Sequence, residues 1–419
     1  MQVVILAAGR SSRFFPFSNL AHKSMAPIMG EPIIIHTIKS VKKSGIKDIL
    51  LVVSPNSEIA KLLGDGSKFG IKITYIIQKE PTGAGNGLLL AEKKIKGNFF
   101  LLNASRLDFS SLKDAMALKK NNVKAVLLGK KQNKLGKYGV LKLNEDRVLD
   151  LIEKPIQGQE PSNIRLIGVY LFSKDFLNIL RKTRDEHYRL ERAISNLAKK
   201  YDVRVTITDK QAPSLKYSWD LLELKDYLLS NSVKSISKKA KIAKSAEVAG
   251  MVVIEDGVVV MEGAKIKGPC YIGKNSVVGN NVILRGGVDV EESCVVGANA
   301  EIKNSLIMKN TKVHSGYVGD CVIGDNVRIG AGFNTANKRI DRGNISVISP
   351  DGDKLDTGLA NLGAIIGSGV KIGIKASTMP GVIIGNDSVI GPGTTVLRNI
   401  PSDMKYYTKF SETIVRKIK

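Results

Sequence analysis

A six-residue repeat in the second half of the chain constrains the fold more than any other feature. Segments in the same phase place an aliphatic residue directly before a glycine, as in YIGKNS, VVGNNV, VIGDNV, RIGAGF, IIGNDS and VIGPGT. A period of six with an inward-facing aliphatic position is typical of a parallel β-helix, in which each hexad supplies one short strand and one corner. Three hexads make one coil, so residues separated by three hexads are predicted to lie one above the other.

The repeat loses its phase at two places. One slip of three residues surrounds His314, and one slip of a single residue surrounds the long polar segment from Asn334 to Ala360. Long insertions in compact scaffolds usually carry function. The corner glycines that define the phase are 273, 279, 297, 324, 330, 367, 373, 385 and 391. We therefore expect reactive groups near these two interruptions.

Two cations share the corner phase of the repeat. Arg285 and Lys303 are separated by three full hexads, so the β-helix hypothesis places them on one edge of consecutive coils. Guanidinium and ammonium groups on one edge suit a phosphate group, because charge-assisted hydrogen bonds to phosphate oxygens are strong.

The N-terminal half begins with a different pattern. Met1 to Leu6 is an apolar run that predicts a buried strand, and Ala7, Ala8 and Gly9 follow it at once. Small residues after a strand let backbone N–H groups approach an anion, and Arg13 adds positive charge. Apolar strand segments and helical segments then alternate, which predicts a doubly wound α/β domain.

Several motifs in this half follow one another in a fixed order. LAAGRSSRFFPFSNLAHKSMAPIMGEPII resembles the opening of the sugar-1-phosphate nucleotidylyltransferases, whose pattern is LAAGxGTRxxPxTxxxPKxxxPIxGKP. Further matches are Gln78 with PTGAGNG, Tyr138-Gly139, Ile152-Glu153-Lys154-Pro155, Asn163, Gly168-Val169-Tyr170 and Ser218-Trp219-Asp220. Joined to the hexad repeat, nearly the whole chain resembles the archaeal bifunctional sugar-1-phosphate nucleotidylyltransferase/acetyltransferases, which resemble N-acetylglucosamine-1-phosphate uridylyltransferase/glucosamine-1-phosphate acetyltransferase.

The resemblance implies a fold and a domain order. Residues 1–232 are expected to form a Rossmann-like α/β nucleotidyltransferase domain, and residues 233–400 a left-handed parallel β-helix with acetyltransferase activity. Residues 401–419 are expected to form a C-terminal tail.

The resemblance also implies the residues of the nucleotidyltransferase site. Lys23 would stabilise charge at the α-phosphate as the sugar phosphate attacks, and Arg13 would hold the nucleotide phosphates, which makes these two residues catalytic. The nucleotide-binding set is Leu6, Ala7, Ala8, Gly9, Arg13, Lys23, Gln78 and Gly83, and the sugar-binding set is Gly139, Glu153 and Asn163.

This chain departs from the family pattern at a metal ligand. The family places an Asp after an apolar strand, as LLxGD, and here Ser105 stands at that position, whereas the second ligand, Asp220, is retained. A neutral hydroxyl binds Mg²⁺ less well than a carboxylate does, because hard cations prefer anionic oxygen. Asp108, three residues further on, is the carboxylate that could take its place. Smaller departures are Ser11 and Ser12 for GT and His22 for proline.

For the β-helix, the resemblance assigns His314, within the segment HSGYVGD, as the general base for the sugar amine. A neutral imidazole suits this role because its unperturbed pKa lies near working pH. The acceptor phosphate and sugar would be held by Arg285, Lys303, Tyr317 and Asn337, and the acetyl-CoA and oxyanion set is Ala331, Lys338, Gly373, Ile374 and Gly391.

Taken together, these assignments predict N-acetylation of glucosamine 1-phosphate or galactosamine 1-phosphate by acetyl-CoA. They also predict nucleotidyl transfer from UTP or dTTP, with Mg²⁺ as cofactor. Two alternatives stay open: an acetyltransferase whose nucleotide domain does not turn over, and a non-catalytic assembly subunit. A homotrimer is expected, since family members trimerise about the coil axis.

The composition indicates which classes of binding partner to expect. The net charge of +25 suits polyanions, but aromatic residues are only 5% of the chain and no nucleic-acid motif is present, so small phosphorylated ligands are favoured over nucleic acid. No apolar run is long enough to cross a membrane, which predicts a cytoplasmic protein without membrane contact. Cys270, Cys294 and Cys321 match no zinc pattern and are interpreted as small buried residues.

Overall fold

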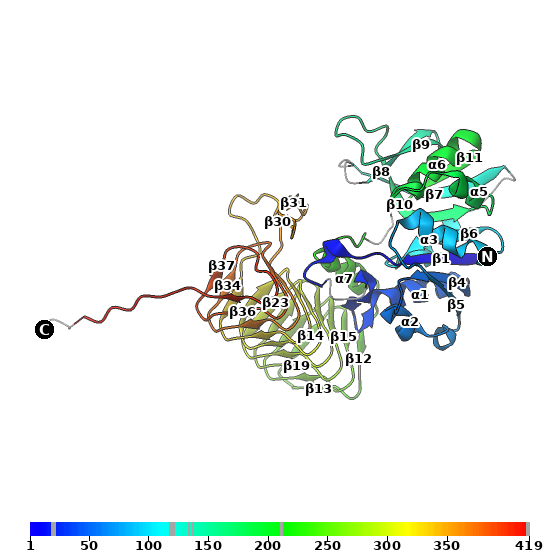
Figure 1. The fold of residues 1–419 in the computed structure, drawn as a ribbon. Helices are drawn as coiled ribbons and strands as arrows, with labels where there is room; N and C mark the ends of the chain where they lie inside the picture. The colour runs from blue at the N-terminus through cyan, green and yellow to red at the C-terminus, as the bar shows by residue number, and fades with distance from the viewer. Residues whose placement is uncertain (18–21, 117–121, 133–134, 136–137, 210–212, 416–419) are drawn as a thin grey trace. The chain divides into compact units, whose positions relative to one another are not determined.

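A computed structural model describes residues 1–17, 22–116, 122–132, 135, 138–209 and 213–415 (Figure 1). The chain forms two compact units. The first comprises Met1–Ser11, Leu20–Ala26 and Glu31–Ser214, and the second comprises Ser12–Asn19, Pro27–Gly30 and Leu215–Lys419. Two short N-terminal segments therefore pack with the C-terminal half of the chain.

The first unit is built on a nine-stranded sheet in the order β5-β4-β1-β6-β10-β7-β11-β9-β8. β1 lies in parallel between β4 and β6, and β10 lies antiparallel between β6 and β7. The strands are β1 Gln2–Ala7, β4 Asp48–Val53, β5 Lys72–Ile77, β6 Phe99–Asn103, β7 Val123–Lys131, β8 Gly139–Asn144, β9 Arg147–Glu153, β10 Ile164–Phe172 and β11 Asp202–Ile207. The antiparallel strands β8 and β9 and strand β11 were not predicted from the sequence.

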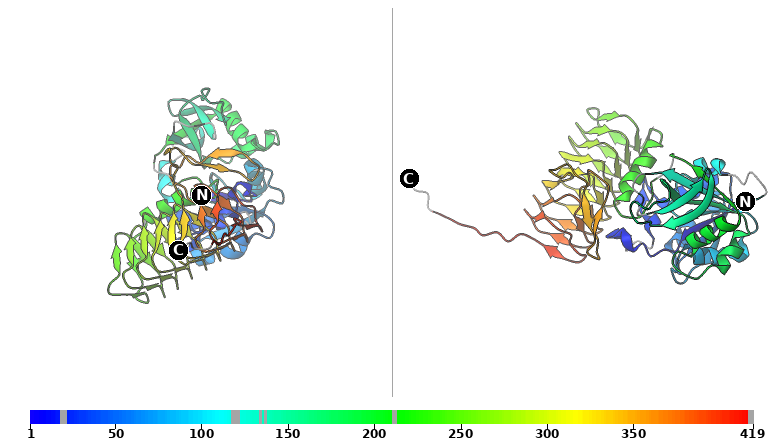
Figure 2. Two further views of the ribbon diagram at one scale, coloured as in Figure 1. Left: turned by 90° about the vertical axis from the view of Figure 1, so that its left-hand side faces the viewer. Right: turned by 90° about the horizontal axis from the view of Figure 1, so that it is seen from above.

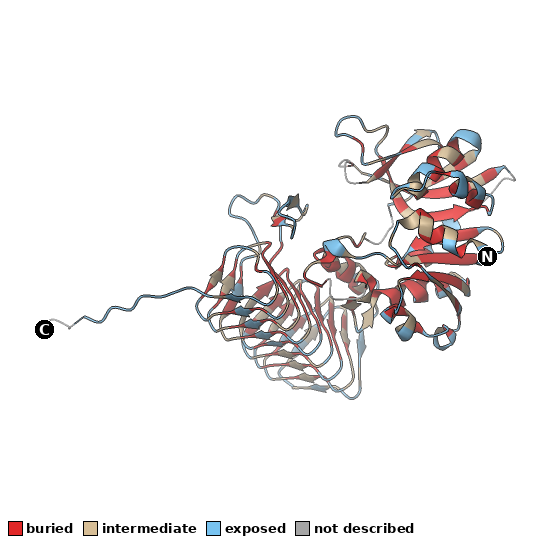
Figure 3. Cartoon of the chain, in the orientation of Figure 1, coloured by how far each residue is buried: buried red, intermediate tan, exposed pale blue. Residues whose placement is uncertain are grey.

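Helices cover the sheet of the first unit. Its central strands are almost wholly apolar because a parallel strand covered on both faces must bury both rows of side chains. Two apolar clusters accordingly form, one on each face, and Figure 3 shows the buried strands with half-exposed helices around them. The helices are α1 Ile33–Lys43, α2 Glu58–Leu63, α3 Ala84–Ala91, α4 Phe109–Leu112, α5 Phe176–Lys182 and α6 Arg189–Lys200. In the described ranges, no helix combines the length and apolar character needed to cross a membrane.

The second unit is a parallel β-helix preceded by helix α7, Asp220–Ser230. Its strands form three sheets, each made of one strand per coil, which Figure 2 shows stacked along the coil. The first sheet contains β12 Ser235–Ile236, β15 Val252–Ile254, β18 Cys270–Ile272, β21 Val288–Val290, β24 Leu306–Ile307, β27 Val322–Ile323, β32 Ile365–Ile366 and β35 Ile383–Ile384. The second contains β13 Lys241–Ile242, β16 Val259–Val260, β19 Val277–Val278, β22 Val295–Val296, β25 Lys312–Val313, β28 Arg328–Ile329, β33 Lys371–Ile372, β36 Val389–Ile390 and β38 Lys405–Tyr406. The third contains β14 Glu247–Ala249, β17 Lys265–Lys267, β20 Ile283–Arg285, β23 Ala300–Lys303, β26 Gly316–Gly319, β29 Phe333–Thr335, β34 Ser377–Thr378 and β37 Thr395–Val396.

The register explains the slip around His314. Arg285 pairs with Lys303, three hexads further on, as predicted. The spacing is one residue shorter at the pair Asp289↔Leu306 and two residues shorter at Ala300↔Gly316. One residue is therefore lost between β23 and β24 and a second between β25 and β26, and the parallel ladder continues through both corners.

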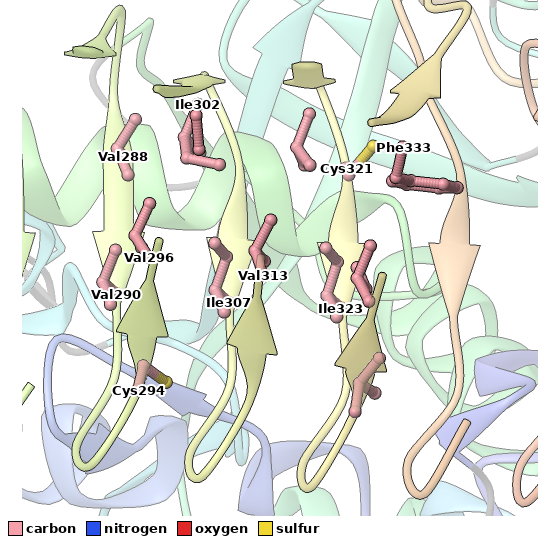
Figure 4. Close-up of a cluster of buried hydrophobic side chains, with 14 of the residues drawn as sticks. Val288, Val290, Cys294, Val296, Ile302, Ile307, Val313, Cys321, Ile323 and Phe333 are labelled. Carbon is pink, nitrogen blue, oxygen red and sulfur yellow. The ribbon is translucent and has the colours of Figure 1, made fainter. Parts of the chain in front are cut away.

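The interior of the coil is a column of small aliphatic side chains. Valine and isoleucine from the three sheets meet at the coil axis, and Figure 4 shows part of this stack, from Val288 to Phe333. The three cysteines are free, buried thiols, as expected from the sequence. Burial raises the pKa of the Cys270 thiol to about 11, so it stays protonated and unreactive at neutral pH.

The polar insertion folds back as a hairpin. β30 Ser346–Ile348 pairs antiparallel with β31 Lys354–Asp356. Asn399 on the coil donates a hydrogen bond from Nδ2 to the carbonyl of Ile348 at 2.7 Å, and Val347 is buried. The coil resumes at Ile365, which pairs with Val322, so the insertion leaves the ladder intact. The described part of the predicted tail includes β38, which pairs with β36, and then continues away from the coil (Figure 1).

Two buried carboxyl groups of the coil receive the loop Pro27–Gly30. Asp289 accepts a hydrogen bond from the Met29 amide at 2.8 Å, and Glu291 accepts one from the Gly30 amide at 3.0 Å. Both carboxyls are at most 3% exposed. Burial away from water raises the pKa of both groups, and their mutual repulsion adds to the effect at Glu291.

Replacing these acids by the double substitution Asp289→Asn, Glu291→Gln should flatten the pH dependence of stability. Carboxyls with raised pKa values keep their protons in the folded state, so wild-type stability falls as pH rises through the window above the ordinary carboxyl pKa of about 4. Between about pH 5 and 8, we expect the wild type to lose about 1 kcal/mol or more relative to the variant, because one pKa unit corresponds to about 1.4 kcal/mol. Urea unfolding at several pH values measures this difference. The control Glu247→Gln, at an exposed position of the coil, should follow the wild type, and parallel curves for wild type and double variant would contradict the prediction.

Candidate functional site

His314 occupies a corner of the coil where its neighbours are glycines. It lies between β25 and β26, above Gly297 and below Gly330: the Gly297 amide donates to the Val313 carbonyl at 2.7 Å, and the His314 amide donates to the Ile329 carbonyl at 2.9 Å. A Cβ on Gly297 would lie only 2.1 Å from the His314 carbonyl oxygen. Glycine is therefore required on either side of His314 for steric reasons, and His314 is an exposed side chain between these two glycines.

Most of the predicted acetyl-CoA residues continue along this edge. A Cβ on Gly330 would lie 2.7 Å from the Ile374 amide nitrogen, and one on Gly373 would lie 2.9 Å from the Gly391 carbonyl carbon. Ala331 follows Gly330 directly, so four predicted residues, Ala331, Gly373, Ile374 and Gly391, are stacked in successive coils beyond His314. Lys338 lies in the insertion, is exposed and forms an isolated antiparallel bridge with Asn361, which directly follows the insertion.

The predicted acceptor residues gather at the other end of β26. Tyr317 lies on this strand, and Asn337 follows the neighbouring strand β29. The Asn337 side-chain amide donates to the Tyr317 hydroxyl at 3.2 Å and also to the carboxylate of Asp320. Lys303 donates to the same carboxylate at 2.8 Å. Asp320 is only 1% exposed and was not identified from the sequence, although it ends the segment HSGYVGD.

The electrostatics of this end differ from the prediction of two adjacent cations. Arg285 and Lys303 do lie side by side, but the guanidinium of Arg285 binds Glu301, with Nε 2.7 Å from Oε1, and Lys303 binds Asp320. The edge therefore carries two ion pairs. Partial burial raises the pKa of the Tyr317 phenol, which keeps this hydroxyl protonated and able to donate.

In the first unit, Gln78 lies between two cavities. A cavity of about 290 Å³ is lined by the loop after β1, including Ala8 and Gly9, and a cavity of about 350 Å³ is lined by Arg189 and part of α3. Gln78 lines both, and its amide donates to the Gly83 carbonyl at 3.3 Å. The predicted nucleotide residues Leu6 and Gly83 thus lie around this glutamine, since Leu6 and Gln78 are both near the Cβ position of Gly87.

Two departures from the family pattern have structural roles near Lys23. The Ser11 hydroxyl accepts a hydrogen bond from the Lys23 amide at 3.0 Å, which ties the loop after β1 to the lysine. His22 caps the turn Lys23–Met25 by accepting from the Ser24 amide. Burial lowers the pKa of His22 to about 3, with the positive charge of Lys23 contributing, so the ring stays neutral and keeps this acceptor.

Two of the three predicted sugar residues lie together in the first unit. Gly139 pairs with Glu153 across β8 and β9, and a Cβ on Gly139 would lie 2.8 Å from the Glu153 carboxylate. Asn163 is exposed and immediately precedes β10. Glu191 on α6 was missed from the sequence: burial raises its pKa to about 7, and the charge of Glu153 contributes to the rise.

The donor set does not fit a two-carboxylate Mg²⁺ site. Ser105 supplies a hydroxyl, and one carboxylate oxygen of Asp220 already accepts from the amides of Lys216 and Tyr217 at 2.6 and 2.8 Å. Asp108 is 2% exposed and forms an ion pair with Arg106 at 2.6 Å, so its charge is already balanced. Among the residues that the structure describes, no three His, Cys, Asp or Glu side chains are grouped to hold a metal.

Two of the predicted nucleotidyltransferase residues belong to the second unit. Arg13 is exposed within the turn Ser12–Phe14, and Asp220 is the first residue of α7. The remaining predicted residues of this activity lie in the first unit.

Comparisons with known proteins find two family matches along the chain. Residues 2–227 match the nucleotidyl transferase family, and residues 251–286 and 363–398 match the bacterial transferase hexapeptide repeats. A protein of Methanocaldococcus jannaschii named bifunctional protein GlmU is 33% identical over all of both chains. A bifunctional sugar-1-phosphate nucleotidylyltransferase/acetyltransferase of Sulfurisphaera tokodaii is 32% identical over 96% of this chain and 98% of its own. The chain belongs to this bifunctional family.

The family assignment confirms the predicted fold class, an α/β nucleotidyltransferase domain followed by a left-handed β-helix of hexapeptide repeats. A solved structure from Bacillus anthracis, named "Putative Glucose-1-Phosphate Thymidylyltransferase", shares the α/β fold, with a TM-score of 0.50 over 56% of this chain and 97% of its own at 19% identity. Family membership also makes the chain a transferase with two domains of different chemistry, and nucleoside triphosphate and acetyl-CoA are its implied substrates.

Gly297→Ala should destabilise the coil next to His314. The added methyl would meet the His314 carbonyl at 2.1 Å, and overpacking of this kind costs about 1–3 kcal/mol. Chemical denaturation of the full chain measures the loss. Gly97→Ala is the matched control, because nothing lies within 4 Å of its Cβ position. Equal stability of the two variants would show that the stacked coils can move apart at this corner to accept the methyl group.

Proposed function

We propose that the β-helix of this chain transfers an acetyl group from acetyl-CoA to the amine of an amino sugar 1-phosphate. The observation that carries the proposal is the arrangement around β26: an exposed histidine in a glycine column at its start, and Lys303, Tyr317 and Asn337 joined through Asp320 at its end. A base and a polar acceptor site on one short strand suit this reaction, since the amine and the phosphate belong to one small molecule.

In this reaction the amine attacks the thioester carbon while the imidazole of His314 takes the amine proton. The C–N bond forms and the C–S bond breaks, and the thiolate of coenzyme A leaves and is protonated. The amide of Ala331, one coil beyond His314, is the proposed donor to the developing oxyanion. Arg285, Lys303, Tyr317 and Asn337 are the proposed ligands of the sugar phosphate, and Lys338, Gly373, Ile374 and Gly391 the proposed contacts of acetyl-CoA.

The full site is proposed to form in a homotrimer. His314 and Ile374 are exposed on one edge of the single chain, and Ile374 is 54% exposed. A second copy against this edge would bury them and enclose the pantetheine arm. Acetyl-CoA and nucleoside triphosphates are cytoplasmic metabolites, which supports the proposed cytoplasmic location.

The α/β unit is proposed to transfer a nucleotidyl group from UTP or dTTP to the sugar 1-phosphate. Gln78 between the two cavities supports a base-reading role, and Glu153 over Gly139 supports the predicted sugar contact. Arg13 and Lys23 are the proposed phosphate ligands. Because Ser105 stands in place of a carboxylate, Mg²⁺-dependent turnover is proposed to be slow. The alternative is an acetyltransferase whose nucleotide domain does not turn over.

His314→Ala should lower kcat for acetyl transfer by about 10²- to 10⁴-fold, the usual contribution of a general base. Thiol release from acetyl-CoA, measured with glucosamine 1-phosphate and galactosamine 1-phosphate, reports the rate. Thermal stability should hardly change, because the residue is exposed. His187→Ala removes another exposed histidine and should leave the rate unchanged. Full turnover of the His314 variant would remove the general-base assignment.

Ser105→Asp should accelerate nucleotidyl transfer, by about tenfold or more, because it supplies the missing anionic donor. Pyrophosphate release from UTP or dTTP, titrated with Mg²⁺, measures both the rate and the concentration of metal required, and the latter should fall. Ser111→Asp adds the same charge on the exposed surface of α4 and should change neither quantity. If the wild type released pyrophosphate rapidly and Ser105→Asp did not change that rate, the Ser105 hydroxyl would not be limiting nucleotidyl transfer.

A further inference from the structure

A buried lysine lies behind the acceptor end of the acetyltransferase site. Lys225 on α7 has a side chain with no exposed surface. Its Nζ donates to the Asp226 carboxylate at 2.5 Å, to the Gly287 carbonyl at 2.7 Å and to the Asn304 side-chain oxygen at 2.9 Å. A buried ammonium group is costly unless its donors are engaged. These three acceptors engage all of them.

The coil is shaped to admit this ammonium group. Gly287 has a φ of +86°, and a Cβ there would lie 2.7 Å from the Asp226 carboxylate and 3.2 Å from the Lys225 Nζ. Any side chain at Gly287 would therefore meet the charged groups. The corner is built around the lysine.

Lys225 fixes the orientation of the Asn304 amide. An ammonium group can only donate, so the oxygen of the amide must face the lysine and the NH₂ group must face away. The Asn304 Nδ2 accordingly donates to Oδ1 of Asp320 at 2.7 Å. The other oxygen of Asp320 accepts from Lys303 and from Asn337.

We propose that Lys225, Asn304 and Asp320 form a positioning relay that holds Lys303 and Asn337 in the geometry in which they bind the amino sugar 1-phosphate. The inference rests on the proposed acetyl transfer and adds residues of α7 and of the coil corner to it. Lys225 and Asn304 act through Asp320, so all three are positioning residues. The relay sets the affinity for the acceptor and leaves the chemical step to His314.

Two positive and two negative side chains lie in and around the relay, so their charges balance. Lys225 and Asp226 come from α7, Lys303 from β23, and Asp320 from the corner after β26. An additional negative charge in the middle of this set would face Asp320 directly. Asn304→Asp introduces that charge without changing the shape of the side chain, and aspartate tolerates the left-handed backbone of this corner, where φ is +43°.

Asn304→Asp should raise KM for the amino sugar 1-phosphate about tenfold at pH 8, because the new carboxylate still accepts from Lys225 but repels Asp320. At pH 6 the ratio of variant to wild-type KM should fall, because two adjacent carboxyls share a proton more readily as pH falls. The shared proton restores a hydrogen bond between the side chain at position 304 and Asp320. KM for acetyl-CoA and kcat should stay within about twofold of the wild type at each pH. Thiol release with the full-length protein gives all three constants.

Two further variants complete the test. Asn310→Asp adds the same charge at an exposed corner with a similar φ of +58° and should behave as the wild type. Lys225→Met should raise the acceptor KM, because it removes the donor that orients Asn304. The rise should be the same at both pH values, since no carboxyl pair forms in this variant. Glu223→Gln, on the exposed side of α7, should leave the acceptor KM unchanged.

An acceptor KM for Asn304→Asp equal to that of Asn310→Asp would overturn the relay. The relay would also be overturned if Asn304→Asp lowered kcat, the affinity for acetyl-CoA and the thermal stability together, because that pattern indicates general damage to the coil. A wild-type protein that acetylates no amino sugar 1-phosphate would instead refute the proposed function, and the relay with it.

Discussion

The close approach of backbone between successive coils is the constraint on which the second unit depends. Each coil donates its amides to the next, and aliphatic side chains fill the interior, so glycines are closely stacked at several corners, including those on both sides of His314. A side chain on such a column has to leave the coil outward. His314 is a member of its column that does so, which makes the scaffold itself responsible for exposing the imidazole.

The same register places the polar groups. Arg285 and Lys303 lie side by side because one full coil of three hexads separates them, and the shortened spacing that follows pairs Lys303 with Gly319, so that Asp320 lies one residue further on, beside Asn304. A carboxylate that is almost wholly buried can be tolerated here because three donors reach it. Helix α7 begins with Asp220 and places Lys225 behind this corner, so one helix carries residues assigned to both halves of the family's chemistry.

The α/β unit shows how departures from a family pattern can have different consequences. Ser11 and His22 replace family residues yet hold the loop around Lys23 through local hydrogen bonds. Ser105 stands at the position proposed for a charged ligand, and the nearby Asp108 is engaged by Arg106. Hydrogen bonding can be supplied by several residue types, whereas anionic charge at a metal position cannot.

The sequence alone determined the coil, the alternating α/β domain and the family, because period, phase and motif order are properties of the chain itself. It also determined that the cysteines are buried and that Arg285 and Lys303 are neighbours. The tertiary structure decided which groups pair: the carboxylates on both cations, the amide of Asn304, the ammonium of Lys225 and the carboxyl of Glu191 near Glu153. Such pairings join segments that are far apart in the chain through side-chain direction and burial, and neither quantity is encoded in a local pattern.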